Sequence, residues 1–354
     1  MSRFLSARRK NLVPYTPGEQ PKDMQYVKLN TNESPFPPSA KAQAYAVEAA
    51  KTLQLYPDPE CTALTKRIAG MCGVDASEVL VTNGSDEILN FAFMAFCDEN
   101  TPAVFPDISY GFYPVFAEIN YVPYTEIPLS ADFSVDVDAY CGIGKNIFIA
   151  NPNAPTGKTI SLDDIERILR TNPDNVVVID EAYVDFGGQT AIPLIKKYDN
   201  LLVTQTFSKS RSMAGGRLGF GVASPALIRD LNTIKYSTNP YNINAMTMAA
   251  GLGILEDEAY TKANCAEIIK NRAYTVEALT ALGFTHTDSY ANFVFVKHNR
   301  VNGKELYLKL KEKGVLVRHF DKEKIADYNR ITVGNREQMD ILIKKIKEIL
   351  EETT

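Results

Sequence analysis

Between residues 62 and 235, short apolar runs alternate with amphipathic stretches, and this alternation constrains the fold most strongly. The run Val176–Asp180 begins with four apolar residues, as expected of a strand covered by helices on both faces. Alternation of strands and helices predicts an α/β fold with a mostly parallel sheet between helices. The expected strands are Val79–Thr82, Ala103–Phe105, Asn146–Ala150, Val176–Asp180, Leu201–Gln205 and Phe220–Val222. The expected helices are Asp86–Phe96, Phe112–Ile119, Leu162–Leu169 and Ala226–Ile234.

The pattern changes after Asn239–Tyr241, which indicates a second domain. A long helical stretch, Tyr260–Leu282, precedes three short apolar runs and two further helical stretches, as in a smaller α+β domain. The N-terminal residues are rich in Pro, Asn and Tyr and show no helical period. We therefore expect residues 1–38 to form an arm and part of the small domain. Residues 39–242 form the large domain and residues 243–354 the small C-terminal domain.

Bulk properties exclude several classes of function. A net charge of −5 disfavours general binding to nucleic acid or to anionic membranes. No apolar stretch reaches the roughly 18 residues that span a bilayer. The five cysteines are scattered and odd in number, which indicates reduced thiols in a cytoplasmic protein. The three histidines lack the spacing of a metal site, so no metal is expected.

Polar residues follow several of the expected strands, where ligands bind in open α/β sheets. The segment Asn83–Glu87 comes directly after a strand and opens a helix. Gly84 permits a tight turn, and the free N–H groups of the first helical turn can hold a phosphate. The alternative is a plain helix cap, since Ser85 and Asp86 are good capping residues.

A carboxylate, Asp180, ends the most apolar strand and is followed by Tyr183. A carboxylate in that position is costly unless a cation meets it. A protonated pyridine nitrogen would do so, and Tyr183 could then reach the 3′-oxygen of the same ring. The alternative for Asp180 is a cap of the following helix.

The segment Thr206–Arg217 follows another strand and contains Lys209 among small residues. A lysine with a lowered pKa can form an imine with a carbonyl group. Thr206, Ser208 and Arg217 offer two hydroxyls and a guanidinium, a set that suits a phosphate. The turn-forming string Asn151–Gly157 gains a function only in the context of the other segments.

Taken in order, these segments resemble those of the fold-type I, class II aminotransferases, which use pyridoxal 5′-phosphate. Among these, the chain is most similar to the histidinol-phosphate aminotransferases. The likeness runs nearly end to end. It covers Leu29–Pro35, Tyr56–Asp58, Thr82–Glu87, Tyr110–Tyr113, Asn151–Gly157, Asp180–Tyr183, Ser208 and Lys209 with Arg217, and Arg330–Gly334.

The resemblance implies a role for each matching residue around the cofactor. Lys209 binds the cofactor covalently and then acts as the base that moves a proton. Asp180 pairs with the ring nitrogen, Tyr183 hydrogen-bonds the 3′-oxygen, and Tyr110 stacks on the ring unless it is an ordinary core aromatic. The phosphate is bound by Ser85, Asp86, Thr206, Ser208 and Arg217. Tyr56 reaches that phosphate from the neighbouring subunit, which implies a homodimer.

The resemblance also implies a substrate site. Arg330 receives the substrate carboxylate, and in histidinol-phosphate aminotransferases it also serves the substrate phosphate with help from a tyrosine of the arm, here Tyr15. Arg318 is a candidate second phosphate ligand, and its alternative is a surface arginine. Asn32 and Glu33 correspond to the substrate entrance, where Glu33 could also be a solvated loop charge.

The chain departs from the family pattern at one position. The family has Asn before Pro-Thr-Gly, where the amide contacts the 3′-oxygen of the cofactor, and Ala154 stands there in this chain. Asn153 is the nearest substitute. If Asn153 does not reach the oxygen, Tyr183 holds it alone.

The resemblance predicts a two-step transamination between a small-molecule amino donor and a keto acceptor. The expected pair is histidinol phosphate with 2-oxoglutarate. Alternatives with the same cofactor are decarboxylation of threonine phosphate and transamination of aromatic or other amino acids. A cofactor-binding sensor without turnover is a further alternative, but such regulators carry a DNA-binding module, and this sequence shows no helix-turn-helix.

Overall fold

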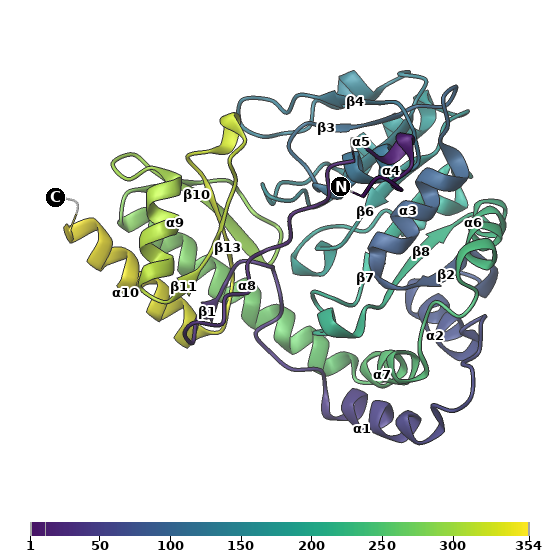
Figure 1. Cartoon of the computed structure of the whole chain (residues 1–354), viewed down its shortest axis with the longest axis horizontal. Helices are drawn as coiled ribbons and strands as arrows, with labels where there is room; N and C mark the ends of the chain where they lie inside the picture. Colours follow the sequence, from purple (N-terminus) through teal and green to yellow (C-terminus); the bar gives the residue numbers. More distant parts are fainter. Residues whose placement is uncertain (1, 11, 353–354) are drawn as a thin grey trace.

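The computed structural model describes residues 2–10 and 12–352. A larger and a smaller body are joined along the long helix α8 (Glu258–Ala281), as Figure 1 shows. The other α-helices are α1 (Ala40–Ala49), α2 (Thr62–Cys72), α3 (Gly84–Phe96), α4 (Phe112–Ile119), α5 (Leu162–Thr171), α6 (Pro225–Thr238), α7 (Ala245–Leu255), α9 (Gly303–Glu312) and α10 (Arg336–Glu352).

A seven-stranded sheet forms the centre of the larger body, with the strand order β2-β8-β7-β6-β5-β3-β4. β8 runs antiparallel to both of its neighbours, and the other neighbouring strands are parallel. The α/β fold with a mostly parallel sheet is therefore confirmed. The strands are β2 (Val79–Thr82), β3 (Ala103–Pro106), β4 (Tyr124–Ile127), β5 (Asn146–Ala150), β6 (Val177–Asp180), β7 (Leu201–Thr206) and β8 (Gly219–Ala223).

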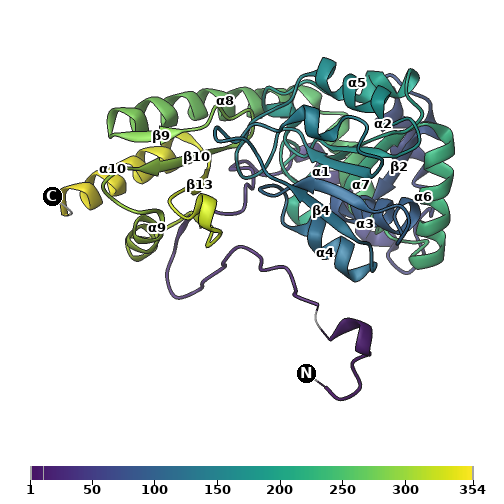
Figure 2. The same ribbon diagram turned by 90° about the horizontal axis from the view of Figure 1, so that it is seen from above.

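Both faces of this sheet are covered, and alternate residues of each strand enter different apolar clusters. In β6, Val177 and Ile179 pack with α2, α5 and α7, whereas Val178 packs with α3, α4 and α6. Because side chains alternate across a strand, a strand apolar at every position needs a layer of helices on each side. Figure 2 shows these layers from above.

The parallel strands β5, β6 and β7 end at the same edge of the sheet. In the pairing of β6 with β7, Asp180 lies opposite Thr204, so the carboxyl ends of these strands are neighbours. α3 begins two residues after β2 ends, at Gly84. The polar residues that follow these strands therefore lie along one edge, as expected for a ligand site in an α/β sheet.

The smaller body contains a four-stranded antiparallel sheet in the order β12-β13-β10-β9, packed against α8, α9 and α10. The N-terminal segment adds to it, because β1 pairs in parallel with β11 beside that sheet. Figure 1 shows the segment running from the small body across to the large one. The strands are β1 (Val27–Lys28), β9 (Phe284–His286), β10 (Phe293–His298), β11 (Val315–Leu316), β12 (Arg318–His319) and β13 (Asn329–Thr332).

Helix α7 follows residue 242 but packs on the large body, against α1 and α2. Ile254 and Leu255 of α7 belong to the same apolar cluster as the central sheet. Gly253 allows this close approach to α1, since a Cβ there would lie 2.7 Å from Ala42 Cα. The apolar core of the large body therefore continues past residue 242.

In the part of the chain that the structure describes, no helix combines the length and the apolar character needed to cross a membrane.

Candidate active site

Two adjoining cavities lie where the carboxyl edge of the central sheet faces the small body. The inner cavity, of about 380 Å³, is lined by residues that follow β2, β6 and β7. The outer cavity, of about 470 Å³, opens between the arm, the segment after β3 and the segment around β12. Both volumes are typical of small-molecule sites. Both cavities are lined by Thr31, Asp86, Tyr110, Ala154, Tyr183 and Lys209.

Lys209 stands three residues after the end of β7, where the two cavities meet. Its Nζ donates a hydrogen bond to the carbonyl oxygen of Thr31 at 3.1 Å. Burial and the positive charge of Arg330 lower the pKa of Lys209 to about 8, against the opposing effect of Glu33. A lysine with so low a pKa is partly neutral near pH 7 and can act as a nucleophile or a base.

Asp180 is a buried carboxylate at the end of β6, with 4% of its surface exposed. Its oxygens accept hydrogen bonds from the Tyr113 hydroxyl at 3.2 Å and the Ala182 N–H at 3.2 Å. Burial and the nearby charge of Asp86 raise the pKa of Asp180 to about 6. Within residues 2–10 and 12–352, no Lys or Arg forms an ion pair with it. A cationic ring nitrogen bound in the cavity would supply the missing partner.

The first turn of α3 and the segment around Arg217 form a cradle for an anion. Arg217 donates to the Ser208 hydroxyl at 3.2 Å and to Asp86 at 3.1 Å. The Thr206 hydroxyl donates to Ser208 at 3.0 Å. Gly84, at φ 75°, makes this approach possible, because a Cβ there would lie 2.6 Å from the Arg217 guanidinium. Helix N–H groups, a guanidinium and hydroxyls together suit a phosphate.

The inner cavity fits pyridoxal 5′-phosphate at each functional group. The anion cradle suits its phosphate, Asp180 suits its ring nitrogen, and Lys209 suits its aldehyde. Tyr110, which also lines the cavity, offers an aromatic face. Its hydroxyl donates to Asp86, which holds the ring near the start of α3.

Two of the residues predicted around the cofactor lie outside both cavities. The amide of Asn153 is used inside the loop, where it donates to the Ile108 carbonyl at 2.9 Å and to the Thr156 hydroxyl at 3.0 Å. Tyr56 lies on the surface, 83% exposed, and stacks on Tyr241 with ring centroids 4.7 Å apart. The structure therefore does not bring either side chain to Lys209 of its own chain.

Arg330, on β13, lines the outer cavity near Lys209. One of its terminal nitrogens donates to the carbonyl oxygen of Asn30 at 3.0 Å. Its buried Nε has no hydrogen-bond partner among the described residues. Burial of a donor without a hydrogen-bond partner costs free energy, so an anion in the cavity would stabilise this guanidinium.

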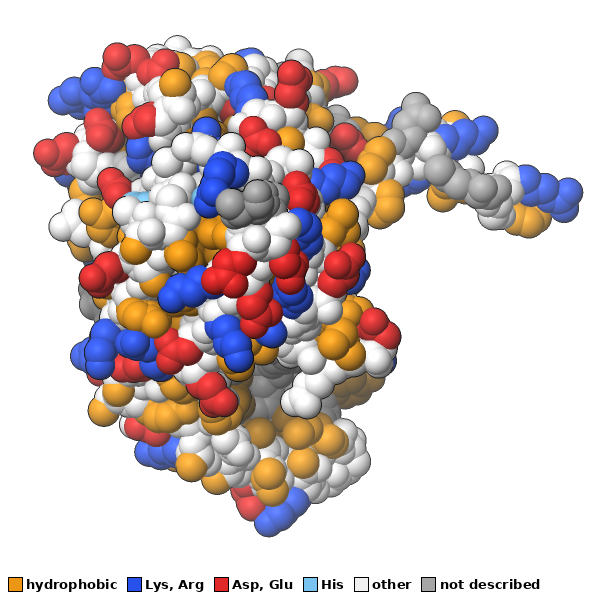
Figure 3. Space-filling model, turned by 90° about the vertical axis from the view of Figure 1, so that its left-hand side faces the viewer, with side chains coloured by type: hydrophobic (Ala, Val, Ile, Leu, Met, Phe, Trp, Pro, Cys, Tyr) orange, Lys and Arg blue, Asp and Glu red, His pale blue; other side chains and the backbone are white. Residues whose placement is uncertain are grey.

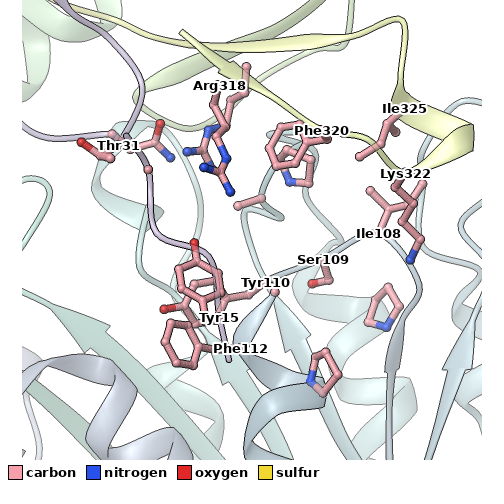
Figure 4. A pocket seen from close by; sticks show the side chains of 18 of the residues that line it. Tyr15, Thr31, Ile108, Ser109, Tyr110, Phe112, Arg318, Phe320, Lys322 and Ile325 are labelled. Carbon is pink, nitrogen blue, oxygen red and sulfur yellow. The ribbon is translucent and has the colours of Figure 1, made fainter. Parts of the chain in front are cut away.

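The arm supplies the opposite wall of the outer cavity. Tyr15 stacks on Phe112 with ring centroids 4.2 Å apart. Arg318 reaches down from β12 toward this aromatic pair, as Figure 4 shows, and donates to the carbonyl oxygens of Thr16 at 3.1 Å and Pro17 at 3.3 Å. The arm therefore holds Arg318 beside the outer cavity, where the side chain stays partly exposed.

Asn32 is buried against Tyr183, and its amide donates to the Tyr183 hydroxyl at 3.0 Å. Glu33, the neighbouring residue, lines the inner cavity and pairs with Lys28 at 2.6 Å. Lys322 of the outer cavity was not anticipated from the sequence. It donates to the Asp107 carbonyl oxygen and lies in a segment without a motif, so only its basic charge offered a signal.

Comparison with known proteins finds similarity along nearly the whole chain. The family model "Aminotransferase class I and II" matches residues 24–346. The chain is 47% identical to a histidinol-phosphate aminotransferase of Brachyspira hyodysenteriae, over 99% of this chain and 100% of that protein. The crystal structure of the histidinol-phosphate aminotransferase of Sinorhizobium meliloti in complex with pyridoxal 5′-phosphate has a TM-score of 0.86 at 21% identity, covering 93% of this chain and 92% of that one.

A structure with another activity is almost as similar in fold. The L-threonine-O-3-phosphate decarboxylase of Porphyromonas gingivalis has a TM-score of 0.81 at 23% identity, covering 92% of this chain and 99% of that one. Similarity of fold alone therefore does not separate the two reactions.

Proposed function

The chain belongs to the class I and II aminotransferases, and from this premise we propose that it transfers the amino group of histidinol phosphate to 2-oxoglutarate, with pyridoxal 5′-phosphate as cofactor. This reaction belongs to histidine biosynthesis. The proposal includes a cytoplasmic location, because the substrates are small soluble metabolites of amino-acid synthesis.

The observation that favours a substrate with a phosphate group is the pair of arginines in the outer cavity. Arg330 has a buried nitrogen that finds no partner within residues 2–10 and 12–352, and Arg318 lies in the same cavity. A phosphate monoester carries up to two negative charges and three acceptor oxygens, so it suits more than one guanidinium. The 47% identity to a histidinol-phosphate aminotransferase supports the same choice.

When bound, pyridoxal phosphate supplies a ring that accepts the electron pair left at the carbon bearing the amino group. We propose that Asp180 keeps the ring nitrogen protonated and that Tyr183 hydrogen-bonds the 3′-oxygen. Tyr110 contacts the ring face. The phosphate is bound by Ser85, Asp86, Thr206, Ser208 and Arg217.

Lys209 Nζ is the group that moves the proton in this proposal. It removes the proton from the substrate carbon that carries the amino group. It then delivers a proton to the carbon of the cofactor's aldehyde group. A pKa of about 8 supports this role, because the neutral amine that accepts a proton is present in a useful fraction near neutral pH.

Arg330 binds the anionic end of each substrate in turn, the phosphate of histidinol phosphate and a carboxylate of 2-oxoglutarate. A planar guanidinium forms paired hydrogen bonds with either group. Arg318 and Tyr15 assist with the phosphate. The aromatic wall of Tyr15 and Phe112 offers an apolar surface for the imidazole ring.

We propose that the enzyme is a homodimer in which Tyr56 binds the cofactor phosphate of the partner. The exposure of Tyr56 supports this, and exposed apolar residues lie close by in sequence, Val47, Leu53 and Leu55. Figure 3 shows the N-terminal arm standing out from the body, and its Phe4 is 81% exposed.

A subunit-mixing experiment tests this assignment. Tyr56→Phe weakens every site of its own homodimer, and Lys209→Ala inactivates its own. A mixed dimer has one site with an intact Lys209 from one chain and an intact Tyr56 from the other. We expect the activity per intact Lys209 to rise on mixing, under conditions of subunit exchange, above that of the Tyr56→Phe homodimer. Mixed dimers with no higher activity per intact Lys209 would show that Tyr56 does not act across the interface.

We also propose that the chain works as two domains, with residues 1–38 divided between the arm and the small domain. The boundary lies within α8 instead of at residue 242, because α7 packs on the large body. Cys265 and Ile268 of α8 already belong to the apolar cluster of the small body.

A spectroscopic experiment tests the proposed reaction. The purified holoenzyme is mixed separately with histidinol phosphate, glutamate and threonine phosphate, and the absorbance of the lysine-bound cofactor is followed. We expect histidinol phosphate to convert the cofactor to pyridoxamine phosphate, and 2-oxoglutarate to reverse the change. Release of carbon dioxide from threonine phosphate, without formation of pyridoxamine phosphate from histidinol phosphate, would replace the proposal with a decarboxylase.

A further inference from the structure

The hydroxyl of Tyr183 has one protein partner among the described residues, the side-chain amide of Asn32. Asn32 Nδ2 donates to the Tyr183 hydroxyl at 3.0 Å. Asn32 is 1% exposed, and Tyr183 lines both cavities. An asparagine from the arm therefore holds a side chain that faces the cofactor site.

The orientation of the Asn32 amide is fixed by Thr332 of β13. The Asn32 backbone N–H donates to the Thr332 hydroxyl oxygen at 2.9 Å. The hydrogen of that hydroxyl is then free to donate to Asn32 Oδ1, at 3.1 Å. Because Oδ1 is thereby engaged as an acceptor, the NH₂ end of the amide faces Tyr183.

Because Asn32 is the donor in this hydrogen bond, the Tyr183 hydroxyl keeps its own hydrogen free to donate to another group. Its oxygen accepts a hydrogen bond from Asn32, and no group in the described part of the chain accepts the hydrogen of its hydroxyl. A hydroxyl that already accepts a hydrogen bond becomes a better donor. Burial raises the pKa of Tyr183, and Arg330 and the bond from Asn32 oppose that effect.

The backbone of Asn32 is also held in place. Its carbonyl oxygen accepts a hydrogen bond from Asn292 Nδ2 at 2.9 Å. Its φ of 57° is in the left-handed region, which Asn and Gly tolerate better than other residues. The position therefore favours a small set of residues, and of these only Asn offers an amide.

No other neutral donor or acceptor of the nearby loop reaches the site. Ala154 is the residue of the Asn151–Gly157 loop that lines the inner cavity, and its side chain is a methyl group. The amide of Asn153 is occupied by Ile108 and Thr156. Tyr183 is therefore the group on this side that can donate to the cofactor's 3′-oxygen.

We propose that Asn32 is a positioning residue that fixes Tyr183 as a hydrogen-bond donor toward the 3′-oxygen of the cofactor. The inference rests on the proposed cofactor site and extends it to a residue expected at the substrate entrance. A donor to that oxygen stabilises its anionic form, so it lowers the pH at which the lysine-bound cofactor loses its proton. Asn32 thereby influences the pH at which the lysine-bound cofactor loses its proton, although Asn32 does not contact the cofactor.

The test measures the midpoint of the pH titration of the lysine-bound cofactor, by absorbance and without substrate. Asn32→Gly removes the amide and keeps the left-handed backbone free of strain. We expect the midpoint to rise by about 0.5 to 1 pH unit, the effect of one hydrogen bond. Asn271→Ala, which removes a buried amide that donates to Gly334, is the matched control and leaves the midpoint unchanged.

Two further variants separate positioning of Tyr183 from a general structural effect. Asn32→Asp has the same shape but accepts the hydrogen of Tyr183, so we expect a larger rise than with glycine. In a Tyr183→Phe background, Asn32→Gly should add no further shift, because the two residues act through one hydroxyl. The affinity of the apoprotein for the cofactor, followed by tyrosine fluorescence, gives a readout independent of activity and should fall in parallel.

An unchanged midpoint in Asn32→Gly overturns the inference, and so does the same shift in the Tyr183→Phe background. Neither result touches the proposed reaction, which is measured with substrates. Conversely, a wild-type protein that shows no absorbance of a lysine-bound cofactor would refute the proposed cofactor site itself.

Discussion

The inner and outer cavities adjoin each other but are built in different ways. The inner cavity is formed mainly by residues 85–217, which follow successive strands of one sheet. The outer cavity is closed by the arm, the segment after β3 and the segment around β12 of the small body. The inner cavity is therefore fixed mainly by a single sheet, whereas the outer cavity forms only when three distant parts of the chain meet.

The two cavities also hold uncompensated charge of opposite sign. In the inner cavity, Asp180 is a buried carboxylate that has no cationic partner among the described residues, and its pKa is raised to about 6. In the outer cavity, the buried Nε of Arg330 has no hydrogen-bond partner in the part of the chain that the structure describes. Each group costs free energy until a ligand of opposite charge arrives. On the proposed function, binding of the cofactor and of the substrate would relieve charges that the fold leaves unpaired.

Removal of Lys209 should have the largest effect, because this residue serves both cavities. Lys209→Ala deletes the proposed covalent anchor and base, and we expect kcat to fall by on the order of 10³- to 10⁴-fold. The absorbance of the lysine-bound cofactor should disappear. Lys145→Ala, at a partly exposed lysine that donates to Thr125, is the control. A surviving imine band would mean that another lysine binds the cofactor.

Arg330→Ala should have the next largest effect and should be confined to the outer cavity. Loss of a buried charge partner costs about 2–4 kcal/mol, so we expect kcat/KM to fall roughly 30- to 1,000-fold for both histidinol phosphate and glutamate. The absorbance of the bound cofactor should remain. Arg300→Ala, at an exposed arginine of the same small body, controls for loss of surface charge. Unchanged kinetics for both substrates would remove Arg330 from the site.

The difference in construction also explains how far the sequence could predict the site. The inner residues follow strands and occur in motifs such as Asn83–Glu87 and Thr206–Arg217, so local pattern places them along one sheet edge. The outer residues have no common local pattern. Lys322 could not be recognised, because its place depends on how the segment after β12 folds back over Asp107.

The same limit applies to secondary structure. The buried strands of the central sheet were predicted within one or two residues, since their apolar runs are unambiguous. β4, an edge strand, was missed because Tyr124–Ile127 is mostly exposed and carries no alternation. α7 was missed because it is apolar on every side and contains two glycines, which erases the helical period. The resemblance to known aminotransferases, and not periodicity, supplied the roles of the individual residues.

Asp180→Asn tests the cost of the buried charge in the inner cavity. The folded pKa of about 6 exceeds the ordinary value of 3.8, so the stability linked to Asp180 is fully present below pH 4 and lost as the pH rises to 6. The Asn variant has no charge to bury. In the apoprotein we expect its free energy of unfolding at pH 7 to exceed that of the wild type by about 3 kcal/mol.

Urea unfolding of the two apoproteins at pH 4 and pH 7 measures this difference. Glu181, whose pKa burial raises to about 7, is present in both proteins and cancels in the comparison. Addition of pyridoxal phosphate should stabilise the wild type more than the variant, because Asp180 then has its cationic partner. A variant less stable than the wild type at pH 7 as an apoprotein would contradict the account of Asp180 as an unpaired charge.

Arg318→Ala should have the smallest effect and the most selective one. Arg318 is partly exposed and already donates to the Thr16 and Pro17 carbonyl oxygens, so its loss removes about 1 to 1.5 kcal/mol of binding to an anion. We expect KM for histidinol phosphate to rise about 5- to 10-fold and KM for glutamate to change little, since Arg330 alone serves a carboxylate. Equal losses for both substrates would mean that Arg318 acts by holding the arm and does not contact the substrate phosphate.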